Sequence, residues 1–255
     1  MSRGAMEDLE QHAYTILKEP SDKQPLWGSI RTRMAALACL GLANVYAMRV
    51  NLSSAVEPMQ CTYEWSDGEE GIILSSFFWG YILFQIPGGM LATHYGGKVV
   101  FGLGVLSTSI FTILLPFCAH SLPLLYAIRG LTGVGEAVTF PALTVMATNW
   151  FPAPERSTLF TFTNAGSFFG TALAFPIAGE LMNMSKKPQD AWSKHQKLCP
   201  NGISTTWPFV FYFFGAVGII WWMLWQRFVT ATPEEHKTIS KEELEYITRT
   251  SKEVF

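Results

Sequence analysis

The stretch GIILSSFFWGYILFQIPGGMLA, residues 71–92, contains no charged residue. A transmembrane helix needs about 20 mostly apolar residues, so this stretch is long enough to cross a bilayer. Residues 157–179 and 207–226 form two further uncharged stretches. A helix at the surface of a soluble bundle would show a polar stripe, whereas these stretches are apolar all round. The sequence therefore predicts an all-α membrane protein rather than a large soluble helical bundle.

The apolar region that begins at residue 99 is too long for one span. It continues past Arg129 to Trp150, and the polar break at 120–123 divides it into two helices. The stretch around Arg49 supplies a first span that is otherwise apolar. We expect six transmembrane helices, at 34–56, 71–92, 98–119, 122–148, 157–182 and 207–228. A polar tail, 1–33, precedes them and a polar segment, 229–255, follows.

The composition of the whole chain agrees with this assignment. Of 255 residues, 49% are hydrophobic and only 15% are charged, against about 25% charged in a typical soluble domain. A net charge of −2 provides no basic face for a nucleic acid. Phosphate-loop and zinc-ligand spacings are absent from the sequence, so we expect no metal, no cofactor and no enzyme. An intramembrane protease is disfavoured, because Ser167 has no histidine in a later helix to act as its base.

Basic residues orient the predicted helices. With the N-terminus inside, 12 Lys and Arg residues fall on the cytoplasmic side and 4 on the other. Cytoplasmic loops carry the excess of Lys and Arg. We therefore expect both termini in the cytoplasm and the loops at 57–70 and 183–206 on the opposite side.

The two non-cytoplasmic loops each carry a cysteine, Cys61 and Cys199. Disulfides persist on that side of a membrane, so we predict that the two cysteines pair; two free thiols are the alternative. Asn183 begins a glycosylation sequon on the same side. The sequon at Asn51 is discounted, because it lies inside the first predicted helix.

Three charged residues lie well inside the predicted spans, away from their ends: Arg49, Arg129 and Glu136. Such residues cost about 2.5–3.5 kcal/mol each on insertion scales and usually face a bundle interior or a water-filled path. Arg129 and Glu136 are seven residues apart and so share a helix face. One interpretation is a structural ion pair. The other is an anion site, because arginine binds carboxylates in a two-pronged geometry, with a carboxyl group that gains and loses a proton.

Small residues, prolines and tryptophans in the spans suggest how the helices pack. Small residues at regular spacing let backbones approach closely, prolines inside a span predict kinks, and tryptophans at a helix end are typical of an interfacial belt. The residues concerned are Gly130, Gly133, Gly166, Gly170 and Ala174, then Pro141 and Pro176, then Trp221, Trp222 and Trp225.

Several longer motifs resemble one family. GMLATHYGGK, residues 89–98, resembles the cytoplasmic loop signature of the major facilitator superfamily, with Thr93 where an acid usually stands. RGLTGVGEAVTFPA, residues 129–142, and WFPAPERS, residues 150–157, resemble its anion:cation symporter branch, most closely the sialic acid carriers of that branch. Stretches 46–53, 75–89 and 211–237 are similar to the same branch.

This resemblance implies both a fold and a function. The superfamily builds its carriers from two six-helix halves, each made of two inverted three-helix repeats, and this chain resembles the N-terminal half. Such carriers move organic anions (sialic acid, acidic sugars or acidic amino acids) or phosphate, in symport with protons or sodium, by alternating access. The resemblance implies substrate binding by Arg49 and Arg129 and proton coupling by Glu136.

The resemblance also implies further roles and a location. It makes Gly89, Gly96 and Lys98 a conformational loop, and a lysosomal or vesicular membrane is expected rather than the plasma membrane. The expected partners are a small organic anion, membrane lipid and a second six-helix half. Phe255 falls within the segment expected to link two halves. The alternative is a truncated, non-transporting isoform that binds and modulates a full-length carrier.

Overall fold

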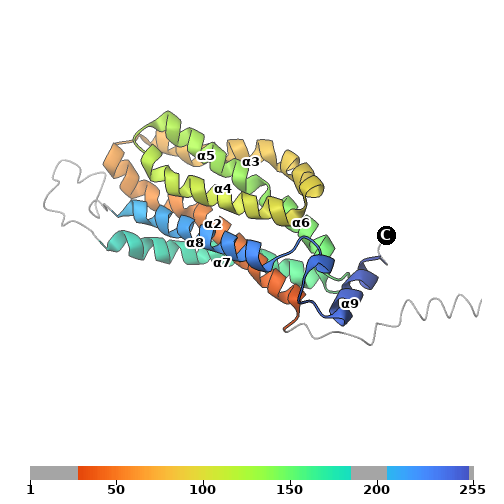
Figure 1. The fold of residues 1–255 in the computed structure, drawn as a ribbon. Helices are drawn as coiled ribbons and strands as arrows, with labels where there is room; N and C mark the ends of the chain where they lie inside the picture. Colours follow the sequence, from red (N-terminus) through yellow and green to blue (C-terminus); the bar gives the residue numbers. More distant parts are fainter. Residues whose placement is uncertain (1–27, 185–205, 253–255) are drawn as a thin grey trace, which may run out of the picture.

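The computed structural model describes residues 28–184 and 206–252, and its regular elements there are all helical (Figure 1). Six spans are long and apolar enough to cross a membrane, with α5 and α6 together forming one of them. This number agrees with the six spans expected from the sequence. The elements are α2 (Ile30–Tyr63), α3 (Asp67–Tyr95), α4 (Gly97–Cys118), α5 (Leu122–Ala137), α6 (Thr139–Trp150), α7 (Arg156–Asn183), α8 (Trp207–Phe228), the 3₁₀ helix η2 (Pro233–Glu235) and α9 (Lys241–Lys252).

The helices pair as two related sets of three. The most extensive contacts join α2 to α7, α3 to α5 and α4 to α8. In this relation α2 corresponds to the α5–α6 span, α3 to α7 and α4 to α8. Exchanging each helix for its counterpart converts the α2–α7 contact into the α5–α3 contact and leaves the α4–α8 contact unchanged. This pairing is the one expected of two three-helix repeats related by a two-fold axis.

Glycines make the first two of these contacts close. A Cβ atom added to Gly166 or Gly170 of α7 would collide with the backbone carbonyls of Cys39 or Ala43 on α2. On the equivalent pair, a Cβ on Gly133 of α5 would collide with the backbone of α3. The predicted small faces therefore lie at helix–helix contacts, where backbone approaches backbone.

The fourth predicted span, 122–148, is divided at Val138, where α5 ends and α6 begins. Pro141 has no N–H, so it cannot donate to the carbonyl of Ala137 four residues earlier. Next to this interruption, the Thr139 hydroxyl donates to the carbonyl of Glu136, at 2.7 Å. The predicted kink thus takes the form of a break three residues before the proline. Pro176, by contrast, lies within an uninterrupted α7.

The predicted loop at 57–70 is wrong in extent. Helix α2 continues to Tyr63 and α3 begins at Asp67, so only three residues connect them. Ser66 caps α3 in a capping box, in which its hydroxyl and the Glu69 carboxylate satisfy each other's backbone N–H groups. Asp67, Glu69 and Glu70 lie in the first turn of α3, close to the positive end of its dipole.

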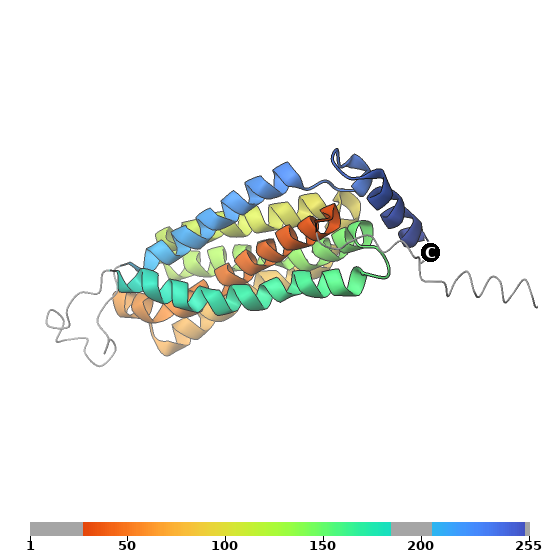
Figure 2. The same ribbon diagram turned by 90° about the horizontal axis from the view of Figure 1, so that it is seen from below.

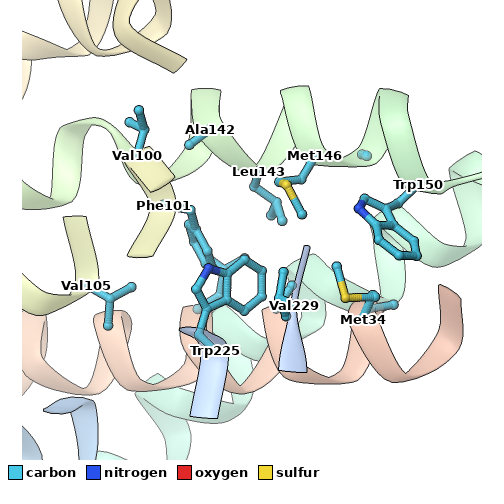
Figure 3. Packing of buried hydrophobic residues seen from close by; sticks show 14 of the residues in the cluster. Met34, Val100, Phe101, Val105, Ala142, Leu143, Met146, Trp150, Trp225 and Val229 are labelled. Atoms are coloured by element: carbon cyan, nitrogen blue, oxygen red, sulfur yellow. The ribbon is translucent and has the colours of Figure 1, made fainter. Parts of the chain in front are cut away.

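The tryptophan cluster at the end of α8 does not form the predicted interfacial belt as a whole. Trp221 and Trp225 are buried, at 5% and 1% exposure. Their indole N–H groups donate to the carbonyls of Leu37, at 2.8 Å, and Lys98, at 3.0 Å. Figure 3 shows Trp225 beside Phe101 and Val229 in the largest hydrophobic cluster. The two rings fill space between α2, α4 and α8, and Trp222 is half-buried.

The polar segment after α8 contains a helix that the sequence analysis did not assign. Helix α9 lies against the end of the bundle (Figure 2). There the buried Arg31 is bonded to Glu155 at 2.8 Å and to Glu243 of α9 at 3.4 Å. The Tyr246 hydroxyl donates to Glu155, and burial together with that carboxylate raises the pKa of Tyr246. This cluster anchors α9 to the membrane domain.

The predicted disulfide and the predicted glycosylation sequon both include residues of the segment 185–205, which lies outside the described part of the chain. Cys199 is one of them, so its pairing with Cys61 stays a prediction. Asn183, the glycosylation candidate, ends α7. Asn51 is buried within α2, which agrees with discounting the sequon there.

Candidate functional site

Arg49 and Glu136 form an ion pair in the interior of the bundle. The guanidinium Nε of Arg49 donates to Glu136 Oε2 at 2.7 Å. The Glu136 side chain is completely buried, whereas that of Arg49 is 21% exposed. Arg49 belongs to α2 and Glu136 to the last turn of α5, so the pair joins the first helices of the two three-helix repeats.

Arg129 lies beside this pair without sharing its hydrogen bond. It is 4% exposed and precedes Glu136 on α5 by two turns. Its guanidinium carbon is 5.3 Å from the centroid of the Phe77 ring, and that of Arg49 is 5.0 Å from the same ring. Phe77 is therefore a common wall for both cations. The structure brings together all three ionisable residues that the sequence singled out, and it places them inside the bundle.

Several polar atoms in this cluster are buried without a hydrogen-bond partner in the described part of the chain. They are Arg49 Nη2, Arg129 Nε and Glu136 Oε1. A buried N–H or carboxylate oxygen without a partner costs about 1–3 kcal/mol, and more when it is charged. Two donors and one acceptor are thus held ready for a ligand, a proton or water.

An aromatic cage around Arg49 was not predicted. The rings of Tyr46, Tyr81 and Phe77 lie 4.5, 4.9 and 5.0 Å from its guanidinium carbon. Aromatic faces attract cations by about 0.5–2 kcal/mol each. Tyr46 precedes Arg49 by three residues, so their helical spacing was a signal in the sequence. The contribution of α3 depends on tertiary packing, which the spacing does not reveal.

This arrangement can exchange one anion for another. Among the described residues, this cluster contains the two guanidinium groups of Arg49 and Arg129 and the single carboxylate of Glu136. One positive charge is therefore left without a counter-charge. In a medium of low dielectric constant such a charge attracts an anion strongly. A proton on Glu136 would remove the negative charge that holds Arg49, and a second anionic group could then take its place.

The residues of the expected conformational loop lie together at one end of α3. Gly89 is in the last turns of this helix, and Gly96 alone separates α3 from α4. Gly96 has a φ of +86°, a value that a residue with a side chain rarely adopts. Lys98 is in the first turn of α4, and its carbonyl accepts the Trp225 bond already described. Their role in conformational change stays a prediction.

Metal binding has no candidate among the described residues, because no three His, Cys, Asp or Glu side chains gather there. Cys39 and Cys118 are free thiols. The site is therefore built from two arginines, one carboxyl group and aromatic rings.

Comparison with known proteins gives related sequences of one kind. A family model described as the Major Facilitator Superfamily matches residues 37–254. The chain is 36% identical to the sialin of Ovis aries, over 89% of this chain and 48% of that protein. It is 34% identical to the chloroplastic ascorbate transporter of Arabidopsis thaliana, over 99% of this chain and 44% of the relative.

A third relative is a chloroplastic sodium-dependent phosphate transport protein of Arabidopsis thaliana, 38% identical over 78% of this chain and 35% of that protein. The chain thus spans about half the length of the curated relatives, or less. Among solved structures, a bacterial homologue of the human lysosomal transporter Spinster is similar, with a TM-score of 0.67 at 21% identity. That match covers 82% of this chain and 46% of the other, and at this identity it shows the fold alone.

Proposed function

The chain belongs to the major facilitator superfamily, and we propose that it forms the N-terminal six-helix half of a secondary active transporter for small anions. Carriers of this fold hold their substrate between two halves and rock one half against the other. One observation carries the proposal. The interior of this half holds two arginines and one carboxyl group, with unpartnered polar atoms on each of the three.

In the proposed mechanism, Arg49 and Arg129 bind the anion and Glu136 couples its movement to a proton. Glu136 in its ionised form holds Arg49 through the 2.7 Å bond. Protonation of Glu136 releases Arg49, which then donates to the carboxylate or phosphate group of the substrate together with Arg129. Departure of the proton restores the ion pair and expels the anion. Substrate and Glu136 thus compete for one guanidinium, which links proton and anion movement.

The substrate class that we favour is a small organic anion such as an acidic sugar or an acidic amino acid. The aromatic rings around Arg49 suit a ligand with both apolar and charged parts, which is typical of pockets for small organic molecules. The relatives are named sialin, an ascorbate transporter and a sodium-dependent phosphate transport protein. The resemblance of the motifs to sialic acid carriers favours a lysosomal or vesicular membrane. Proton coupling is preferred to sodium coupling because the site offers a titratable carboxyl group.

Uptake into proteoliposomes tests the proposal, with a carrier that contains these residues and a second six-helix half. We expect a pH gradient to drive uptake of an acidic sugar. The Glu136→Gln variant should lose this dependence on the gradient and keep anion binding, whereas Arg129→Gln should lose binding. The matched control is Glu180→Gln, because Glu180 is exposed on α7. Full dependence on the gradient in Glu136→Gln would refute the coupling role.

A further inference from the structure

A cavity of about 740 Å³ lies at the end of the bundle where α2 and α4 begin and α8 ends. Segment 229–238 closes its other side. Leu37 lines the cavity and is twelve residues from Arg49, which corresponds to about 18 Å along α2. The cavity is therefore distinct from the site around Glu136. Its size falls within the range of about 300–1,000 Å³ that is common for ligand pockets.

The lining of this cavity is strongly basic. Its charged residues are Arg33, Lys98, Arg227 and Lys237, with Glu235 as the one carboxylate. The salt bridges in the described part of the chain involve only Arg31 and Arg49, so no ion pair there neutralises these four cations. Arg227 contacts the ring of Phe228 at 5.8 Å. Four like charges around one hollow repel one another and favour a ligand with several negative charges.

The remaining lining combines apolar residues of α2 and α8 with the polar residues Gln226, Thr230, His236 and Thr238. Met34, Leu37 and Val229 form part of the wall. Leu40, one turn beyond Leu37 on α2, is 59% exposed, and Phe228 at the end of α8 is 54% exposed. Basic groups thus stand beside exposed apolar side chains where membrane-spanning helices end. A small soluble anion would contact only the cations. A lipid would contact the cations with its headgroup and the exposed apolar side chains with its acyl chains.

We propose that this cavity binds the headgroup of an anionic phospholipid that carries more than one phosphate group. The cations bind the phosphate oxygens through charge-assisted hydrogen bonds. Basic pockets between transmembrane helices are known to recognise multiply charged lipid headgroups. Lys98 belongs both to this cavity and to the first turn of α4, so the lipid would contact the start of this helix, directly after Gly96.

The test measures binding of a short-chain phosphatidylinositol bisphosphate to the detergent-solubilised full chain by microscale thermophoresis. We expect binding in preference to short-chain phosphatidylcholine. Each basic side chain near a membrane surface contributes about five-fold in affinity, so Lys98→Gln combined with Arg227→Gln should weaken binding by about 30-fold. The matched control is Lys241→Gln with Arg249→Gln, which removes two exposed cations from α9, outside the cavity.

Three outcomes would overturn the proposal. The first is no preference for the phosphorylated lipid over phosphatidylcholine. The second is equal weakening by the control pair, which would indicate general electrostatic attraction. The third is equally tight binding of soluble inositol trisphosphate, which would indicate a site for a free anion. Arg33→Gln gives a second, independent variant, because this side chain is exposed and its replacement leaves the buried contacts of α2 intact.

Discussion

Glu136 is a buried side chain whose charge stabilises a neighbouring arginine. Its carboxylate is completely buried and holds Arg49 at 2.7 Å. Removal of one partner from a buried ion pair leaves a charge without compensation and costs about 3–5 kcal/mol. We expect Glu136→Ala to lower the stability of the purified chain by about this amount. Thermal unfolding in detergent measures the change.

Two comparisons make this prediction specific. Glu136→Gln keeps an oxygen that accepts from Arg49 Nε, so its loss of stability should be smaller than that of Glu136→Ala. Glu180→Ala removes an exposed carboxylate from α7 and should have little effect. Equal stability of Glu136→Ala and the wild-type chain would mean that the ion pair contributes nothing to the fold.

Phe77 is the second residue on which the structure of the site depends. Its ring lies close to the guanidinium groups of Arg49 and Arg129, and its side chain is 1% exposed. Truncation of a buried phenylalanine costs about 3–5 kcal/mol, so Phe77→Ala should destabilise the chain by that amount. The adjacent Phe78 is 50% exposed, and Phe78→Ala should cost much less. Urea or thermal unfolding of the two variants distinguishes them, and similar losses would contradict the placement of Phe77.

At the scale of helices, glycine spacing determines how α7 packs on α2. A Cβ on Gly170 would collide with the backbone of Ala43, whereas a Cβ on Gly179 of the same helix would meet nothing within 4 Å. Overpacking costs about 1–3 kcal/mol, and alanine is favoured over glycine by about 1 kcal/mol inside a helix. We therefore expect Gly170→Ala to lower the thermal stability and Gly179→Ala to leave it unchanged or raise it. The opposite order would show that α2 and α7 pack differently.

The break between α5 and α6 has a local cause with a wider effect. Pro141 removes one helical hydrogen bond, and the helix is interrupted at Val138. Glu136 is two residues before this break, so its carbonyl is bonded to the Thr139 hydroxyl. The proline predicts that the span is distorted, whereas the structure shows that the break lies beside a buried carboxyl group and that α6 packs on α3 and α4.

At the scale of the whole molecule, α9 connects the segment after α8 to the membrane domain. Arg31 is fully buried and pairs with both Glu155 and Glu243. We expect Arg31→Ala to leave two carboxylates facing each other and to release α9 from the bundle. Faster amide hydrogen exchange in residues 241–250, with unchanged exchange in α7, would be the measured result.

The control for this prediction is Arg33→Ala, since Arg33 is exposed on the same turn of α2. It should leave exchange in α9 unchanged. If Arg31→Ala also left this exchange unchanged, the contacts of Tyr246 and Ile247, both buried, would be sufficient to hold the helix.

The sequence by itself determined that six helices are long and apolar enough to cross a membrane and that three charges lie well inside them. The physical reason is local, because an uncharged stretch of this length can satisfy its backbone in a bilayer only as a helix. Which groups meet was decided by tertiary structure. Arg129 and Glu136 share a helix face, yet the bond to Glu136 comes from Arg49 on α2, 87 residues away. The burial of Trp221 and Trp225 and the docking of α9 likewise depend on partners distant in the chain, which spacing within one helix cannot specify.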